Sequence, residues 1–351
     1  MPTRAARALP QRARKFKRFG EWIEMDLPTR RIAALFAWAL WLATAATPAP
    51  AATGAERIQF TSANRSTSIE ALYKGKARYD EVIHGDLTLP DSPKGPVPAM
   101  VIMHGSGGVE GGTALKWARF FQAMGIASFV VDSFGPRSIA ATASDQSQIT
   151  YTTSGIDALK ALEALAKDTR IDPARIGVIG FSRGGVATQQ AAFERFKLSV
   201  VPDGLKFAVH FPLYGGCSQY GKTTGAPVVH FVGDEDDTFR IERCEKTTRL
   251  SNEAGASNRL VVLKGAQHGF DRDNLAWIRV PQMQVWKQCS FETDMDTLQA
   301  HIPGNDRATV GEVTAYRKSC MTLGAKYGGD TSASRTTERE IVRVLTDLRF
   351  R

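Results

Sequence analysis

The pattern of apolar and polar positions predicts strands and helices in alternation along most of the chain. Short, almost wholly apolar runs predict buried strands, at 98–105, 126–132, 175–181, 206–214, 226–234 and 258–269. Between them apolar residues recur at helical spacing, at 113–125, 154–168, 184–196 and 239–255. Strands that alternate with helices of this length imply a mostly parallel sheet. The predicted fold class is therefore α/β, with helices on both faces of a central sheet.

The sequence on either side of this region has a different pattern. Before it, three strand-like runs predict a starting antiparallel portion, at 56–61, 67–73 and 81–89. After it, residues 274–330 are less regular and are interpreted as an insertion, called the insertion segment below, before an amphipathic helix at 336–350. No internal repeat or low-complexity linker interrupts 56–270, so we expect one domain over 53–351.

The first 52 residues have the composition of a leader. Residues 1–31 carry nine Lys/Arg and three Asp/Glu, and an uncharged apolar stretch of fifteen residues follows at 32–46. Small residues come next, and Ala49 and Ala51 form an A-x-A cleavage pattern. This order predicts a signal peptide, because a membrane-spanning helix usually needs ~20 apolar residues. An uncleaved anchor is the alternative, and Met25 is a second candidate start.

The leader also explains most of the positive charge. Residues 1–31 contribute nine minus three, or +6, of the formal +9, so the rest of the chain carries only +3. A body with so small an excess has no evident basic stripe, which argues against nucleic acid as a partner. We expect a periplasmic or secreted protein that has no stable membrane insertion after cleavage of the signal peptide.

The four cysteines fit an exported chain. They lack C-x-x-C spacing, and an oxidising compartment makes disulfides plausible. Four cysteines allow three pairings; our hypothesis joins chain neighbours, Cys217 with Cys244 and Cys289 with Cys320. Four buried free thiols are the alternative. No spacing of histidines suggests a metal site, since His210 and His230 lie within apolar strands. We expect neither a metal nor a cofactor.

The stretch GFSRGG raises the question of a nucleophile. Ser182 stands in a G-x-S-x-G pattern with Gly180 and Gly184, directly after a predicted buried strand and directly before a predicted helix. A sharp turn there would lift the hydroxyl clear of the sheet, and side chains at the two glycines would collide with the neighbouring strand or helix. A turn with no catalytic role is the alternative.

Candidates for an acid and a base follow in the expected order. The strand at 226–234 runs into the acidic sequence GDEDD, and the last strand ends at His268. Because ligand sites of parallel sheets collect at the carboxyl ends of the strands, these side chains can converge on Ser182. His268 would take the proton of Ser182, and Asp236 would hold the imidazole, with Asp237 as the alternative acid.

A glycine-rich loop supplies the remaining part. MHGSGG, at 103–108, follows an apolar strand and lets backbone N–H groups turn into a cavity. We predict an oxyanion hole formed by the backbone N–H groups of Ser106 and Arg183. A phosphate-binding loop is the alternative, but neither dinucleotide nor P-loop spacing is present.

In their combined order, HGSGG, VVDSFGPR, GFSRGG, GDEDD and AQHGF resemble the dienelactone hydrolase family of the α/β-hydrolase superfamily, over roughly 80–272. The resemblance implies an α/β-hydrolase fold and places Ser182, Asp236 and His268 at the nucleophile, acid and base positions. The family keeps a cysteine at the nucleophile, so Ser182 makes an esterase more plausible than activity on dienelactones. Arg137, in FGPR, would line the cleft and favour an acidic substrate group; a structural salt bridge is the alternative.

These features predict a secreted or periplasmic serine hydrolase that cleaves carboxylic esters, and lactones as an extension, through an acyl-enzyme. The partner is a small-molecule ester, and the oligomeric state is not readable from the sequence. A serine peptidase of the prolyl-oligopeptidase type is a second enzymatic reading, although the chain has no propeller-sized domain. A non-catalytic binding protein with this fold is the third.

Overall fold

The computed structural model describes residues 54–91, 93–272 and 275–350. The expected signal peptide and the alternative start at Met25 lie outside the described residues. Among the described helices, none combines the length and the apolar character that crossing a membrane requires.

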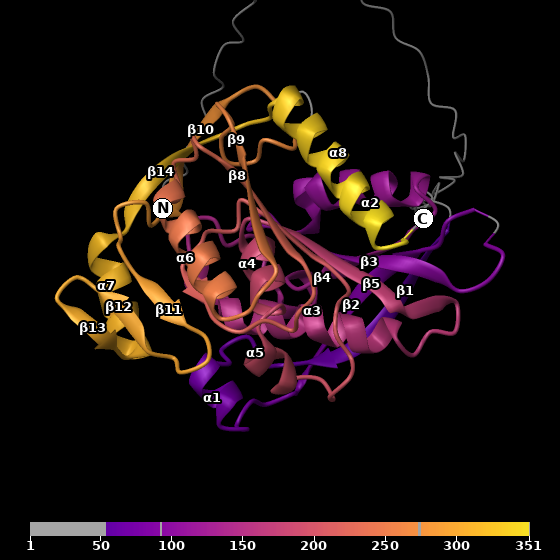
Figure 1. Cartoon of the computed structure of the whole chain (residues 1–351), viewed down its shortest axis with the longest axis horizontal. Coiled ribbons are helices and arrows are strands. Elements are labelled where there is room, and N and C mark those ends of the chain that lie inside the picture. Colours follow the sequence, from indigo (N-terminus) through magenta and orange to yellow (C-terminus); the bar gives the residue numbers. More distant parts are fainter. Residues whose placement is uncertain (1–53, 92, 273–274, 351) are drawn as a thin grey trace, which may run out of the picture. The chain divides into compact units, whose positions relative to one another are not determined.

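A mostly parallel sheet organises the described chain (Figure 1). Its eight strands have the order β1–β2–β4–β3–β5–β6–β8–β9. They are β1 Ala55–Ser62, β2 Glu81–Thr88, β3 Val97–Met103, β4 Ala127–Asp132, β5 Ile171–Phe181, β6 His210–Leu213, β8 Val228–Gly233 and β9 Asn258–Leu263. Strand β2 pairs antiparallel with β1 and β4, whereas the remaining pairs are parallel. The predicted antiparallel start and parallel continuation are both confirmed.

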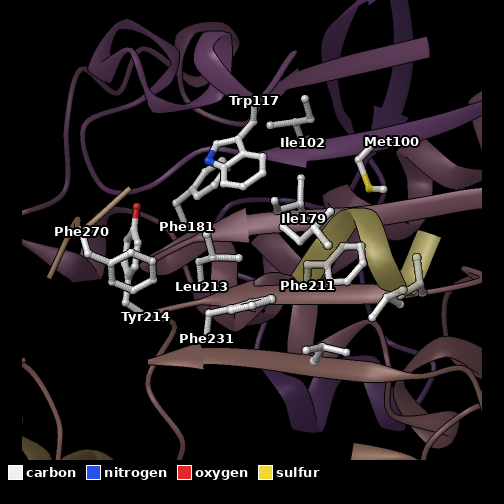
Figure 2. Close-up of a cluster of buried hydrophobic side chains, with 14 of the residues drawn as sticks. Met100, Ile102, Trp117, Ile179, Phe181, Phe211, Leu213, Tyr214, Phe231 and Phe270 are labelled. Carbon is white, nitrogen blue, oxygen red and sulfur yellow. The ribbon is translucent and has the colours of Figure 1, made fainter. Parts of the chain in front are cut away.

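Helices pack on both faces of the sheet because successive strand residues point to opposite sides. From β3, Met100 and Ile102 join one buried cluster (Figure 2), whereas Val101 joins the other. The first cluster includes side chains of α2 Thr113–Ala123, α6 Ile241–Glu253 and α8 Thr331–Asp347. The second includes side chains of α1 Ile69–Tyr73, α3 Tyr151–Leu165, α4 Arg183–Gln190 and α5 Glu194–Leu198. This is the α/β architecture that the sequence predicts.

One predicted strand is wrong. The run at 67–73 forms the short helix α1, because Ser68 caps it: the Ala71 N–H donates to the Ser68 hydroxyl oxygen at 3.2 Å. Glu70 in the first turn adds a favourable charge at the helix N-terminus. The apolar residues Ile69 and Leu72 stand three apart and face the core from this helix.

The insertion segment has structure of its own. Strands β10 Ile278–Val285 and β14 Thr322–Tyr327 form an antiparallel ribbon. Between them lie β11 Glu292–Asp294, β12 Ala300–Ile302, β13 Asn305–Ala308 and helix α7 Val310–Cys320. The three strands form a four-stranded sheet with β7 Gln219–Tyr220, in the order β13–β12–β11–β7. The hypothesised disulfides are present: Cys289–Cys320 closes this part of the segment, and Cys217–Cys244 joins the β6–β7 connection to α6.

Candidate active site

Ser182 occupies a sharp turn between β5 and α4. Its φ of 53° and ψ of −113° are strained for a residue with a side chain, and such strain is typical of functional sites. A Cβ at Gly180 would overlap the carbonyl oxygen of Gly184, and one at Gly184 would overlap the carbonyl oxygen of Met103. The predicted collisions are confirmed, so both positions require glycine for the turn to form.

A hydrogen-bond chain leads away from the serine hydroxyl. Ser182 Oγ lies 2.9 Å from His268 Nε2, and His268 Nδ1 lies 2.8 Å from Asp236 Oδ2. A carboxylate only accepts hydrogen bonds, so Nδ1 carries the proton and Nε2 is free to accept the hydroxyl proton. His268 and Asp236 are only 2% and 1% exposed, whereas Ser182 is partly exposed. The arrangement can activate the hydroxyl as a nucleophile.

Two neighbouring aspartates have different partners. Asp236 Oδ1 accepts from the Thr238 N–H and hydroxyl, both at 2.7 Å, while Oδ2 faces His268. Asp237 instead accepts from the Lys326 N–H at 3.2 Å and so faces the insertion segment. Of the two candidates for the acid, Asp236 is therefore the one in contact with the imidazole. Thr238, which orients Asp236, was not singled out from the sequence, although its place two residues after an acid is typical of such turns.

A buried carboxyl group supports the loop that carries His268. Asp271 accepts from the Tyr214 hydroxyl and from Trp117 Nε1, each at 2.6 Å. Burial raises the pKa of Asp271 above its usual range. The Tyr214 ring stands edge-on to the His268 ring, with centroids 4.8 Å apart. These contacts support the imidazole on the side of Tyr214. No pattern in the sequence predicts them, because the residues come from distant elements.

The predicted oxyanion loop lies beside the serine. A Cβ at Gly105 would come within 3.7 Å of the Ser182 Cβ. His104 Nε2 accepts from the Ser133 N–H at 3.1 Å, so Nδ1 carries the proton and donates to the Gly105 carbonyl at 2.8 Å. Because a trans peptide directs its C=O and N–H to opposite sides, this bond turns the Ser106 N–H away from His104.

The Ser106 and Arg183 backbone N–H groups have no acceptor among the described residues. Arg183 begins α4, where N–H groups lack a partner within the helix. Both groups are therefore available to stabilise a negatively charged oxygen near Ser182.

The Arg183 side chain is committed elsewhere. Its guanidinium donates to the Gln146 side-chain and main-chain oxygens, both at 2.8 Å, and to the Ile149 carbonyl at 3.0 Å. It also stacks on the Tyr151 ring, 4.2 Å from the centroid. Burial lowers the pKa of this arginine. The side chain is a brace for the loop at 146–151.

The expected substrate contact of Arg137 is corrected by its position. Its side chain is 2% exposed and forms a bidentate ion pair with Asp157, at 2.7 and 2.9 Å. It also pairs with Glu81 and donates to the carbonyls of Ser133 and Ala63. A guanidinium has five N–H donors, and these partners consume them. The structural ion pair is therefore the arrangement that forms.

Residues of the insertion segment contact the main chain of His268 and Asp236. Tyr327 of β14 forms an isolated parallel bridge with His268, and the Gly328 N–H donates to the His268 carbonyl at 3.1 Å. Lys287 Nζ donates to the Asp236 carbonyl at 2.7 Å. The main chain at Asp236 and at His268 is therefore held by residues of the insertion segment to which the sequence pattern assigns no role.

Two further histidines lie inside the central sheet. His210 and His230 are buried in β6 and β8, as expected, and burial lowers their pKa values to about 3 and about 4. Within the part of the chain that the structure describes, no group of three metal-ligating side chains occurs.

The sheet order, the turn at Ser182 and the side chains gathered at the carboxyl edge define an α/β hydrolase. Residues 83–288, more than half of the chain, match the model of the dienelactone hydrolase family. The chain therefore belongs to this hydrolase family, as the resemblance implied. None of the curated proteins matches it.

The solved structures that match this chain have low sequence identity to it. A thermophilic esterase from Thermogutta terrifontis is 16% identical, with a TM-score of 0.41, and the match covers 55% of this chain and 82% of that one. A dienelactone hydrolase-like promiscuous phosphotriesterase from metagenomic libraries is 14% identical, with a TM-score of 0.46 and coverage of 84% and 99%. An α/β hydrolase from a Medee basin deep-sea metagenome library is 18% identical, with a TM-score of 0.42 and coverage of 62% and 84%.

Proposed function

We propose that the mature protein is a secreted or periplasmic serine hydrolase that cleaves carboxylic esters through an acyl-enzyme. The observation that carries this proposal is the chain of hydrogen bonds from Ser182 through His268 to Asp236. Two unpaired backbone N–H groups beside the serine, on Ser106 and Arg183, complete the set of groups that acyl transfer needs.

In the first half of the reaction Ser182 attacks the ester carbonyl. His268 Nε2 takes the hydroxyl proton as the Oγ–C bond forms, and Asp236 stabilises the imidazolium. The carbonyl oxygen becomes an oxyanion that accepts from the N–H groups of Ser106 and Arg183. Each such donor lowers the barrier by about 2.7 to 4 kcal/mol. The C–O bond to the alcohol then breaks, and His268 returns its proton to the leaving alkoxide.

In the second half water replaces the alcohol. His268 takes a proton from the water as its oxygen attacks the acyl carbon, and the same two N–H groups hold the second oxyanion. Collapse of this intermediate breaks the bond to Ser182 Oγ, which regains a proton from His268. The carboxylic acid leaves, and the enzyme returns to its starting state without any cofactor.

The substrate class follows from the nucleophile and its surroundings. A serine stands where the family keeps cysteine, so simple esters, and lactones as cyclic esters, are proposed in place of dienelactones. The guanidinium groups of Arg137 and Arg183 are taken up by acceptors of the chain itself. The proposal therefore includes no acidic group on the substrate.

The domain organisation and location are part of the same proposal. Residues 1–52 are a signal peptide and basic leader, and 53–351 are the hydrolase domain with its insertion at 274–330. The pairs Cys217–Cys244 and Cys289–Cys320 support an oxidising compartment, because disulfides persist there and are rare in the cytosol.

The test is turnover of short p-nitrophenyl esters by the Ser182→Ala variant. We expect turnover to fall to the background rate while the unfolding transition stays at the wild-type temperature. Ser319→Ala is the matched control, since this exposed serine bonds only the Tyr316 carbonyl, and it should keep full activity. Undiminished turnover by Ser182→Ala, or failure of the wild type to hydrolyse any ester or lactone, would refute the proposal.

A further inference from the structure

Gln146 connects Ser106 and Arg183, the two residues whose backbone N–H groups are the predicted oxyanion donors. Its side-chain N–H donates to the Ser106 hydroxyl at 2.9 Å, and its side-chain oxygen accepts from Arg183 Nε and Nη2 at 3.0 and 2.8 Å. The orientation of the amide follows from its partners, because a guanidinium has donors only and must face the oxygen. One side chain therefore bridges both sides of the predicted oxyanion hole.

The bridge matters because the two N–H groups belong to separate parts of the chain. Ser106 lies in the loop after β3, and Arg183 begins α4 after β5. Strands β3 and β5 pair directly, which sets the distance between their ends, but no hydrogen bond in the described chain joins Ser106 itself to Arg183. The exact position of the Ser106 loop relative to Arg183 therefore also depends on the side chains that contact both. A shift of about 1 Å in such a pair can cost on the order of 100-fold in rate.

Gln146 is itself held by the insertion segment. It starts the short 3-10 helix Gln146–Gln148, and its backbone N–H donates to the Gln284 side-chain oxygen of β10 at 3.1 Å. The Gln284 N–H donates to the Ala143 carbonyl at 3.0 Å, so two bonds join β10 to this loop. The insertion segment is thereby connected, through Gln146, to both residues of the predicted oxyanion hole.

We propose that Gln146 is a positioning residue that sets the separation of the Ser106 and Arg183 N–H donors, and that Gln284 holds it in that position. This proposal rests on the proposed function, since it gives Gln146 a role in the same acyl transfer. In this role Gln146 acts on the tetrahedral intermediate, in which the former carbonyl oxygen of the substrate is negatively charged. Loss of Gln146 should therefore lower kcat and leave ground-state binding of the substrate almost unchanged.

The test compares Gln146→Ala with Gln148→Ala, its neighbour in the same helix. Gln148 is exposed and bonds only the carbonyls of Ala141 and Asp145, so this control perturbs the loop without touching the bridge. Rates are divided by the concentration of sites that a fluorophosphonate titrates, which removes any misfolded fraction. We expect Gln146→Ala to lower kcat by about 10- to 100-fold with KM within about threefold of wild type.

A trifluoromethyl ketone supplies the readout that a merely structural role would not move, because it forms an anionic tetrahedral adduct with the serine. Its affinity should fall in Gln146→Ala by the same factor as kcat. Gln284→Ala should show the same pattern at about 3- to 10-fold, and Gln148→Ala should stay within about twofold.

Gln146→Met keeps a side chain of similar length but lacks the amide that bonds Ser106 and Arg183, so it tests the bridge if Gln146→Ala fails to fold. It should lower kcat by about 10-fold or more. Wild-type kcat and ketone affinity in the folded Gln146 variants would overturn the proposal. Absence of fluorophosphonate labelling in the wild type would instead overturn the proposed function, so the two failures are distinguishable.

Discussion

The carboxyl edge of the central sheet and the insertion segment both place residues around His268, but different interactions hold them. At the edge, Asp236 and His268 follow β8 and β9, which pair in register over six positions of a continuous parallel sheet. In the insertion segment, the β10–β14 ribbon pairs over five positions with a register shift, and Cys289–Cys320 closes the remainder.

Because different interactions hold the two regions, we expect substitutions in each region to have different effects. The edge is fixed by main-chain hydrogen bonds that extend through the whole sheet, so a change to the side chain of Asp236 or His268 should alter the chemistry with little change in fold. The insertion segment is held by one ribbon, one small sheet shared with β7, one disulfide and two small apolar clusters. A change there should alter local stability first and reach the chemistry only through its few contacts with the edge.

The largest expected effect separates the two neighbouring aspartates, one facing each region. Asp236→Asn should lower kcat by about 10⁴-fold, because the amide disfavours the imidazole tautomer that accepts the serine proton, whereas Asp237→Asn should stay within about threefold. Steady-state kinetics on one p-nitrophenyl ester measures both. A larger loss of kcat in Asp237→Asn than in Asp236→Asn would mean that Asp237, which faces the insertion segment, is the acid that acts on His268.

The Arg137→Met variant tests whether the buried ion pair of Arg137 stabilises the fold without taking part in the reaction. Arg137→Met leaves the fully buried Asp157 without its partner, which should cost about 3 to 5 kcal/mol of unfolding free energy. Urea denaturation measures this loss. Per titrated active site, kcat and KM should match wild type for neutral and acidic esters alike. A selective rise in KM for the acidic ester would restore the substrate-binding role.

Removal of the Cys289–Cys320 disulfide tests whether the insertion segment is stabilised separately from the sheet. Its cysteines are 31 residues apart, and a loop of that length predicts about 3 to 4 kcal/mol of stabilisation. In Cys289→Ser/Cys320→Ser, hydrogen exchange should become faster within 275–330 and stay slow in β8 and β9. Exchange that also accelerates in those two strands would show that the insertion segment is not a separately stabilised part.

The smallest expected effect is a pH dependence inside the sheet. Burial lowers the pKa of His230 from 6.5 to about 4, so below pH 6.5 the unfolded chain binds a proton that the folded chain does not. This contribution to stability is present in full above pH 6.5 and is lost as the pH falls toward 4, by up to about 1.4 kcal/mol per pH unit.

His230→Leu removes the imidazole that binds this proton in the unfolded chain. Its unfolding free energy, measured in urea at several pH values, should therefore fall less steeply than that of wild type between pH 6.5 and 4. Identical slopes for the two proteins would contradict the assignment of a buried neutral histidine.

Much of the edge could be predicted from the sequence because its signals are local. Apolar runs locate the strands, and the glycines around Ser182 mark a turn that a side chain would block. The order of strands then brings Asp236 and His268 to one edge. The helix at 69–73 is not predicted, because five residues are too few to establish a helical period and its main signal is the single capping residue Ser68.

The braces around the site could not be predicted because they depend on distant partners. Gln146 meets Arg183 across 37 positions and Gln284 across 138. Arg137 illustrates the same point: its motif suggests a cleft residue, yet Asp157 and Glu81 capture its guanidinium once the loops pack. Pairing of long polar side chains is decided by tertiary packing, which no periodicity in the sequence encodes.

The central claim is that Ser182 is an activated nucleophile, and covalent labelling tests it most directly. Wild-type protein treated with a fluorophosphonate and digested with trypsin should carry one adduct, on Ser182, found by mass spectrometry, and the adduct should be absent after Ser182→Ala. A folded wild-type protein that takes up no label, or labels with equal speed after Ser182→Ala, would contradict the account.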